Sequence, residues 1–264
     1  MTRETVGDLT AEHAAPVGEA KPIPVLFVHG LWASASLFAR YLPFAAERGW
    51  DGWALNLRGR DGSRPGTDVG RASMQDFARD VRATLDELGQ VVLVGHSMGS
   101  LVAQMVGSDP RVRALVLMCP IPPRGIVSLS GPVVRSSGPY LSRMLRGRAF
   151  RPGREAQERI IMNRLAPEDG DAWFASSVVD SGVAARQIAL GAVKVDASKI
   201  RAPVLVVSAA DDRISPPGLQ PKMVRRYRAV HRTFTGHAHL ITLEPDWQTP
   251  ASAVLDWAER ILSP

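Results

Sequence analysis

A serine lies at the centre of the segment LVGHSMGS, residues 93–100, in a pattern that could carry nucleophilic chemistry. Ser97 is flanked by Gly95 and Gly99, and it follows an apolar run and precedes a helix-like pattern. A sharp strand-to-helix turn of this kind exposes the serine hydroxyl and leaves no room for side chains at the two glycine positions. The helix would also point its N-terminus at the serine, which favours developing negative charge. We therefore predict a nucleophile here, the alternative being a glycine-lined turn with an idle serine.

A serine hydroxyl is a weak nucleophile, so it needs a general base and two backbone donors for the oxyanion. The segment FVHGLW, residues 27–32, follows a predicted strand, and Gly30 lets the chain turn sharply there. We expect the amide of Leu31 to face the serine and the amide of Met98, next to the serine, to be the other donor. We also expect Trp32 to line the substrate site, although a core position would explain this residue equally well.

Acid and base candidates occur in pairs near the C-terminal end of the chain. Asp211 and Asp212 follow the apolar run 203–208, and His237 and His239 share the segment GHAH. The residue types alone leave both choices open. An H-x-H pair would need a third ligand to bind a metal, and none is suggested nearby. We therefore predict no metal and no cofactor.

The elements that position these residues follow from hydrophobic patterning. Apolar runs predict buried strands at residues 23–29, 53–57, 91–95, 112–118 and 203–208. Apolar residues at helical spacing predict a helix that ends at Gly89, and further helices are expected at residues 97–106 and 247–262. Strands that alternate with helices indicate an α/β fold with a mostly parallel central sheet flanked by helices.

The chain of 264 residues is 45% hydrophobic, which fits one α/β domain with an insertion. Residues 1–22 are polar and rich in small residues, so we expect a loose N-terminal arm. Residues 23–120 and 196–264 form the predicted core. Residues 121–195 break the alternation and are too long for an ordinary loop, so we interpret them as a helical cap.

The net charge of +6 is concentrated in the predicted cap. Residues 124–164 hold nine arginines and two glutamates, so the rest of the chain is close to neutral. This local excess argues against a nucleic-acid-binding protein. It indicates either a solvated surface or attraction of an anionic acyl substrate or an acidic protein partner. In the same cap, Trp173 and Phe174 are candidate substrate contacts.

No apolar run is long enough for a membrane span, and the N-terminus lacks the apolar region of a secretory signal. We therefore expect a soluble cytoplasmic protein that acts on a small-molecule acyl substrate. Nothing in the sequence indicates an oligomeric state.

These motifs together resemble the α/β-hydrolase fold superfamily, and within it the single-domain serine esterases and lipases with a cap. The segments that carry the resemblance occur in the family order between residues 23 and 262: LFVHGLW, ALNLRGRDGS, LVGHSMGS, LVVSAADDRISPP and GHAHLITLEPDW. The resemblance implies a cap after the sixth strand and a Ser–Asp–His triad in chain order. The chain departs from its relatives at Arg60, where they often carry histidine.

The resemblance also implies which acid and which base belong to the triad. The family pattern places a proline four residues after the acid, and the segment DRISP fits this register with Asp212. His239 has an acid five residues downstream and a helix that starts soon after, as in related esterases. We therefore predict the triad Ser97, Asp212 and His239, with Asp211 and His237 as the alternatives.

The resulting functional prediction is a serine hydrolase that cleaves a carboxylic ester or thioester through an acyl-enzyme intermediate. One alternative is a lyase, acyl-transfer or C–C bond reaction on the same fold, because fold does not fix function. Another is a ligand-binding protein with little turnover. The acyl group and the leaving group remain open.

Overall fold

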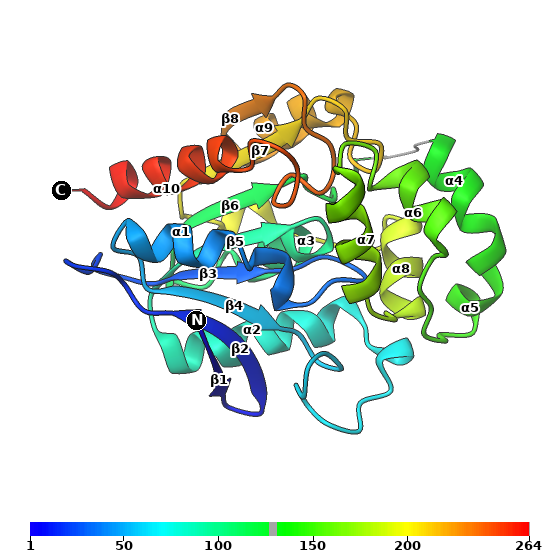
Figure 1. Ribbon diagram of the computed structural model, residues 1–264, viewed down its shortest axis with the longest axis horizontal. Helices are drawn as coiled ribbons and strands as arrows, with labels where there is room; N and C mark the ends of the chain where they lie inside the picture. The colour runs from blue at the N-terminus through cyan, green and yellow to red at the C-terminus, as the bar shows by residue number, and fades with distance from the viewer. Residues whose placement is uncertain (127–130, 264) are drawn as a thin grey trace.

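The computed structural model describes residues 1–126 and 131–263, and a central β-sheet runs through them (Figure 1). In this part of the chain the sheet has eight strands in the order β1-β2-β4-β3-β5-β6-β7-β8. Strands β3 to β8 are mutually parallel, whereas β2 pairs antiparallel with β1 and with β4. The predicted α/β fold with a mostly parallel sheet is confirmed. The strands are β1 Thr2–Val6, β2 Leu9–Ala14, β3 Val25–Val28, β4 Gly52–Asn56, β5 Val91–His96, β6 Val112–Met118, β7 Val204–Ala209 and β8 Val230–Phe234.

Helices cover both faces of the sheet because the central strands are apolar on both sides. In β3, Val25 and Phe27 belong to one core cluster, whereas Leu26 and Val28 belong to the other. The first cluster includes side chains of α1 (Tyr41–Glu47) and α10 (Gln248–Leu262). The second includes side chains of α2 (Met74–Leu88), α3 (Met98–Val106) and α9 (Gln220–Tyr227).

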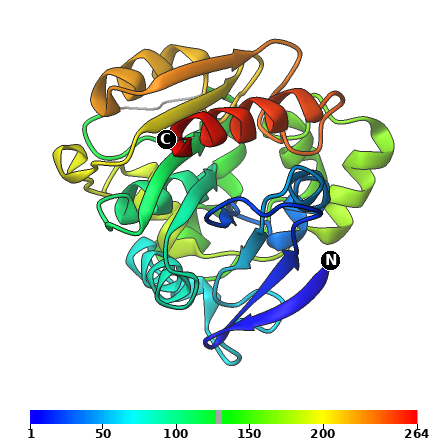
Figure 2. The same cartoon turned by 90° about the vertical axis from the view of Figure 1, so that its left-hand side faces the viewer.

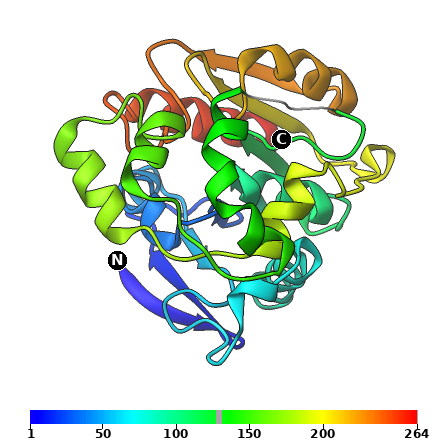
Figure 3. The same cartoon turned by 90° about the vertical axis from the view of Figure 1, so that its right-hand side faces the viewer.

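Five further helices lie between β6 and β7, beyond the carboxyl ends of the parallel strands (Figure 1). Figure 3 looks onto these helices, which lie in front of the sheet in that view. They are α4 Gly131–Ser137, α5 Leu141–Leu145, α6 Arg154–Ile160, α7 Pro167–Ser176 and α8 Gly182–Ala189. They fall within the range 121–195, of which residues 127–130 lie outside the described residues. No helix of the described ranges is long and apolar enough to cross a membrane.

The N-terminal residues differ from the expected loose arm. Strands β1 and β2 form an antiparallel hairpin that extends the sheet beyond β4, at the edge opposite β8 (Figure 2). The turn between them contains Gly7 at a φ of +62°, a conformation that glycine adopts without steric cost. Within the hairpin, the side chains of Val6, Leu9 and Ala11 are buried. Their alternation with polar residues is the strand signal that composition alone obscures.

The hairpin leads to a prediction about stability. Leu9 is completely buried, so Leu9→Ala should lower the free energy of unfolding by about 2–5 kcal/mol. The matched control is Val17→Ala, because the Val17 side chain is 64% exposed; its effect should stay within about 0.5 kcal/mol. Urea denaturation of both variants measures the difference. A loose arm would instead give two variants as stable as the parent chain.

Candidate active site

Ser97 lies at the sharp turn between β5 and α3. Its backbone has a φ of +54° and a ψ of −122°, a strained conformation for a residue with a side chain. A Cβ added to Gly95 would lie 2.3 Å from the carbonyl oxygen of Gly99, and one added to Gly99 would lie 2.1 Å from that of Val28. Close backbone approach therefore requires glycine on both sides of the serine, as the sequence pattern predicts.

Two other predicted residues lie in line with the serine hydroxyl. Nε2 of His239 is 2.8 Å from Oγ of Ser97, and Nδ1 of His239 is 2.9 Å from Oδ2 of Asp212. Asp212 follows β7 and is fixed by the backbone amides of Ile214 and Ser215, which donate to Oδ1 at 2.8 and 2.9 Å. All three members of the chain of hydrogen bonds are buried.

The charge state of Asp212 follows from its surroundings. Burial alone would raise the pKa of this carboxyl group, but the charge of His239 and three sets of hydrogen bonds, from His239, Ser215 and Ile214, hold the pKa below its ordinary value. The carboxylate therefore accepts Nδ1–H of His239. Nε2 is then left to accept the proton of the serine hydroxyl.

The alternative acid and base have other partners. Oδ2 of Asp211 accepts from Nε of Arg164 at 2.9 Å. Nδ1 of His237 lies 3.4 Å from Oε2 of the buried Glu244. The structure thus brings the preferred pair to Ser97 and places Asp211 and His237 in other interactions. The catalytic roles themselves stay predictions.

His96 adds a contact that fixes the backbone of His239. Its Nε2 donates to the carbonyl oxygen of His239 at 2.7 Å. Burial, together with the charge of His239, lowers the pKa of His96 to about 3, so this imidazole is neutral in the folded protein at neutral pH. His96 therefore links the turn that carries Ser97 to the loop that carries His239.

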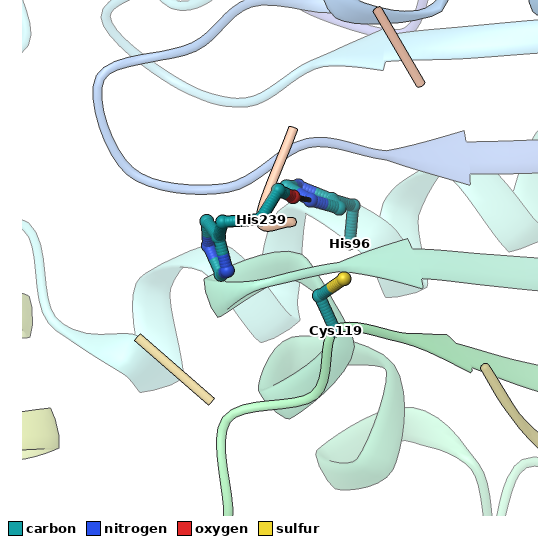
Figure 4. A group of neighbouring side chains, drawn as sticks. All are labelled: His96, Cys119 and His239. Carbon is teal, nitrogen blue, oxygen red and sulfur yellow. Dashed lines mark hydrogen bonds between the residues drawn. The ribbon is translucent and has the colours of Figure 1, made fainter. Parts of the chain in front are cut away.

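Figure 4 shows the group among the described residues that could hold a metal ion: His96, Cys119 and His239, whose candidate ligand atoms lie within 4.8 Å of one another. Nδ1 of His96 has no hydrogen-bond partner within the described part of the chain, but the other ring nitrogens of the group are engaged. His96 donates to a carbonyl, and both ring nitrogens of His239 have partners among the proposed triad residues. Burial raises the pKa of the Cys119 thiol well above its ordinary value, which keeps it protonated and a poor ligand. The cluster therefore gives no support for a metal.

The loop after β3 lies directly against the serine. A Cβ added to Gly30 would lie 2.8 Å from Cβ of Ser97. His29 holds this loop, because its Nδ1 bonds to the carbonyl of Gly30 at 2.8 Å and its Nε2 accepts from the amide of Leu57 at 3.3 Å. Burial and the charge of Arg60 lower the pKa of His29 to about 3, which keeps the ring neutral. Leu31, the predicted oxyanion donor, follows in this loop.

A cavity of about 420 Å³ opens over the serine between the core loops and the helices α4 to α8. Leu31, Trp32 and Met98 contribute to its wall from the core. Trp173 contributes from α7, and its Nε1 donates to Oε1 of Gln157 at 2.8 Å. The remaining wall is mostly apolar. It includes Phe150, and also Met144, Ile160, Ile161 and Ile214, which the sequence analysis did not place there. Ile214 could have been found, because it lies within the DRISP motif of Asp212.

Phe174 differs from the prediction. It does not contribute to the cavity wall; instead its ring lies beneath the guanidinium groups of Arg151 and Arg154, at 4.6 and 5.9 Å from the ring centroid. Trp173 and Phe174 are adjacent on helix α7 and therefore point in different directions. Here the cavity wall takes Trp173, and Phe174 packs against the two arginines.

The geometry can be compared with known proteins. A family model described as the alpha/beta hydrolase family matches residues 25–249, which is most of the chain. The chain belongs to this family. A protein from Mycobacterium phage D29, named as a non-heme haloperoxidase, is 38% identical to this chain over 101 residues. That match covers 36% of this chain and only 35% of the relative's length.

Solved structures with the same fold cover this chain nearly end to end. A thermophilic esterase from Thermogutta terrifontis has a TM-score of 0.75 at 21% identity, over 97% of this chain and 95% of its own. A monoacylglycerol lipase from Paleococcus ferrophilus has a TM-score of 0.71 at 18% identity, over 96% of this chain and 99% of its own. At these identities the likeness establishes the shared fold.

The buried histidines His29 and His96 make the stability of the protein depend on pH. The pKa of His29 and that of His96 are near 3 in the folded protein, against an ordinary value of 6.5. Between these pH values the unfolded chain binds more protons, so stability falls on acidification from about pH 6.5. Each histidine contributes at most about 1.4 kcal/mol per pH unit. His96→Gln should reduce the slope by that amount in urea titrations from pH 6.5 down to about 4.5; an unchanged slope would mean that His96 is not buried as the neutral ring.

Proposed function

We propose that this hydrolase cleaves carboxylic esters or thioesters through an acyl-enzyme intermediate on Ser97. The observation that carries the proposal is the continuous hydrogen-bonded chain from Oγ of Ser97 through His239 to Asp212, at 2.8 and 2.9 Å. The serine end of this hydrogen-bonded series lies at the floor of a mostly apolar cavity that can receive an acyl group.

In the proposed reaction, His239 removes the proton of the Ser97 hydroxyl as the oxygen attacks the substrate carbonyl. The imidazolium that forms is stabilised by the ionised Asp212. The amides of Leu31 and Met98 would stabilise the oxyanion, and Met98 is the first residue of α3, where amides have no partner within the helix. His239 then protonates the leaving group, and it activates the water that releases the acyl group.

The names of similar proteins agree with this reaction class but do not fix it. The similar structures are an esterase from Thermogutta terrifontis and a monoacylglycerol lipase from Paleococcus ferrophilus. The phage relative, in contrast, is named as a haloperoxidase. We propose that residues 121–195 act as the cap over the substrate, since helices of this range supply much of the cavity wall. The aligned serine and histidine fit acyl chemistry, and the ester and fluorophosphonate experiments below test it against the other reactions of the fold.

The charged lining of the cavity bears on the proposed anionic substrate. Among the nine arginines of residues 124–164, Arg124 contributes to the cavity wall described by the structure. Arg143 lies away from the wall, and its Nη1 donates to the carbonyl of Ala149. Attraction of an acyl chain that ends in a carboxylate would therefore act through Arg124, not through the cap surface as a whole.

The triad proposal predicts specific losses of activity. Ser97→Ala should lower kcat for a p-nitrophenyl ester by about 10⁶, and His239→Gln should cause a similar loss, because triad members act as a unit. A fluorophosphonate should label Ser97 in the parent chain and fail to label Ser97→Ala, as mass spectrometry of the intact protein would show.

The matched control for the base is His237→Gln, which changes the other histidine of the same loop. It should lower kcat by no more than about tenfold, because His237 contacts Glu244 and not the serine. The reverse ranking of the two histidine variants would transfer the role of the base to His237. Normal turnover by Ser97→Ala would rule out the acyl-enzyme mechanism.

The role of Arg124 can be tested with two p-nitrophenyl esters of equal length, one ending in a carboxylate and one in a methyl group. Arg124→Gln should lower kcat/KM for the carboxylate ester about fivefold, the scale of an exposed ion pair, and leave the neutral ester unchanged. Added salt should reproduce this difference in the parent chain. Arg143→Gln is the control, and an equal effect of both variants would assign the preference to general surface charge.

A further inference from the structure

A buried ion pair joins the core to the helices α4–α8. Arg60 lies in the loop after β4, and Asp180 lies between α7 and α8; Nη2 of the arginine donates to Oδ2 of the aspartate. Both side chains are fully buried. An isolated buried charge is strongly unfavourable, so each group depends on the other. Arg60 is also the position at which the sequence departs from the family pattern.

Asp180 reaches the loop of the proposed oxyanion donor. Its Oδ2 accepts the amide of Trp32 at 2.8 Å, and its Oδ1 accepts the amide of Ser181 at 2.6 Å. The carbonyl oxygen of Trp32 accepts from the amide of Val178 at 2.9 Å. Both backbone polar groups of Trp32 are therefore held by the segment between α7 and α8.

The position of Asp180 is itself fixed by backbone pairing. Its amide and carbonyl pair with those of Phe150 at 2.9 and 3.0 Å, in an antiparallel bridge. Arg60 is fixed from the core side, since its Nη1 donates to the carbonyl of Arg58 at 2.8 Å and its guanidinium lies 5.0 Å from the centroid of the Phe77 ring. The side chains of Arg60 and Asp180 are therefore each fixed by contacts other than their own ion pair.

The backbone of Trp32 has a strained conformation that its surroundings must stabilise. Trp32 has a φ of +62°, which is uncommon for a residue with a side chain and persists only where the surroundings stabilise it. The amide of Trp32 belongs to the same peptide plane as the carbonyl of Leu31. Fixing that plane restrains Leu31 on its C-terminal side, as the bond of His29 to Gly30 restrains the loop on the N-terminal side.

We propose that Arg60 and Asp180 are positioning residues that hold the Leu31 amide in place for the oxyanion and so couple the cap to the active site. This inference rests on the proposed ester hydrolysis. Asp180 acts through the amide of Trp32, and Arg60 acts by keeping the carboxylate ionised and in place. Neither side chain touches the substrate.

The environment of Asp180 makes Asp180→Asn a sharp test. The groups that contact its two carboxylate oxygens are all donors: Arg60, Trp32 and Ser181. If the amide oxygen of asparagine keeps the bonds to Arg60 and Trp32, its NH₂ faces the N–H of Ser181; in the other orientation Trp32 loses its acceptor. Either way asparagine loses one contact and removes the charge that pairs with Arg60. We expect kcat for a p-nitrophenyl ester to fall about 10- to 100-fold, less than the loss of a whole oxyanion donor, with KM little changed.

The matched control is Asp169→Asn. Asp169, on α7, pairs with Arg40 of the core and so also joins the two parts of the chain, but it does not contact the loop of Leu31. Its kcat should stay within about twofold of the parent value. An equal loss in both variants would show that Asp180 serves only to attach the cap, and would overturn the proposal.

A second variant separates positioning from folding. In the double variant Arg60→Met with Asp180→Leu, apolar side chains replace the buried pair, which commonly preserves or raises stability. We expect the variant to fold, with a melting temperature below that of the parent because the amides of Trp32 and Ser181 lose their acceptor. We expect a kcat at least as low as that of Asp180→Asn, because leucine offers the Trp32 amide no acceptor. A well-folded double variant with the parent kcat would overturn the proposal.

Hydrogen exchange supplies a readout that does not need activity. Mass spectrometry of a peptide covering residues 29–33 should show protected amides in the parent and in Asp169→Asn, and faster exchange in Asp180→Asn and in the double variant. Unchanged protection in the last two would overturn the proposal. A parent chain that binds no fluorophosphonate and cleaves no ester would contradict the proposed function instead, and the exchange measurement would still decide whether the pair holds the loop.

Discussion

The close approach of three backbone segments at Ser97 is the constraint on which the site depends. The turn at Ser97, the start of α3 and the loop after β3 come very close together. A Cβ at Gly95, Gly99 or Gly30 would therefore overlap neighbouring atoms. This contact brings the loop of Leu31 against the serine without any side chain in between. The strained φ of Ser97 is tolerated because the parallel strands and α3 fix both ends of the turn.

Buried polar groups around this turn act mainly on orientation. His29 and His96 are kept neutral by burial, and each donates to a carbonyl of a loop that bears a proposed functional group. In a site with little water, such hydrogen bonds are strong and costly to break. Asp212 is the contrasting case, because hydrogen bonds and the nearby His239 keep it ionised despite burial. Neutral rings thus fix the loops, while one ionised carboxylate fixes the base.

The sequence predicts those parts of the protein whose signals are local. The apolar runs of the central strands and the glycines around Ser97 report requirements met within a few residues, so the strands and the turn were placed closely. The N-terminal hairpin was missed because its alternation is weak and its pairing with β4 is distant in sequence. The direction of the Phe174 side chain depends on how helix α7 is rotated against the core. The role of Asp180 depends on contacts with residues more than a hundred positions away in the sequence. No local pattern encodes either.

The two histidines of the GHAH segment have different surroundings in the structure. Each histidine has its own carboxylate: His239 meets Asp212 after β7, and His237 lies beside Glu244. Glu244 also accepts the amide of Ala238 at 2.6 Å, so it fixes the peptide between the two rings. With the bond from His96 to its carbonyl, His239 is restrained from three separate segments. An imidazole held in this way needs little reorganisation to accept a proton, which is the preorganisation that the proposed role of His239 as the base requires.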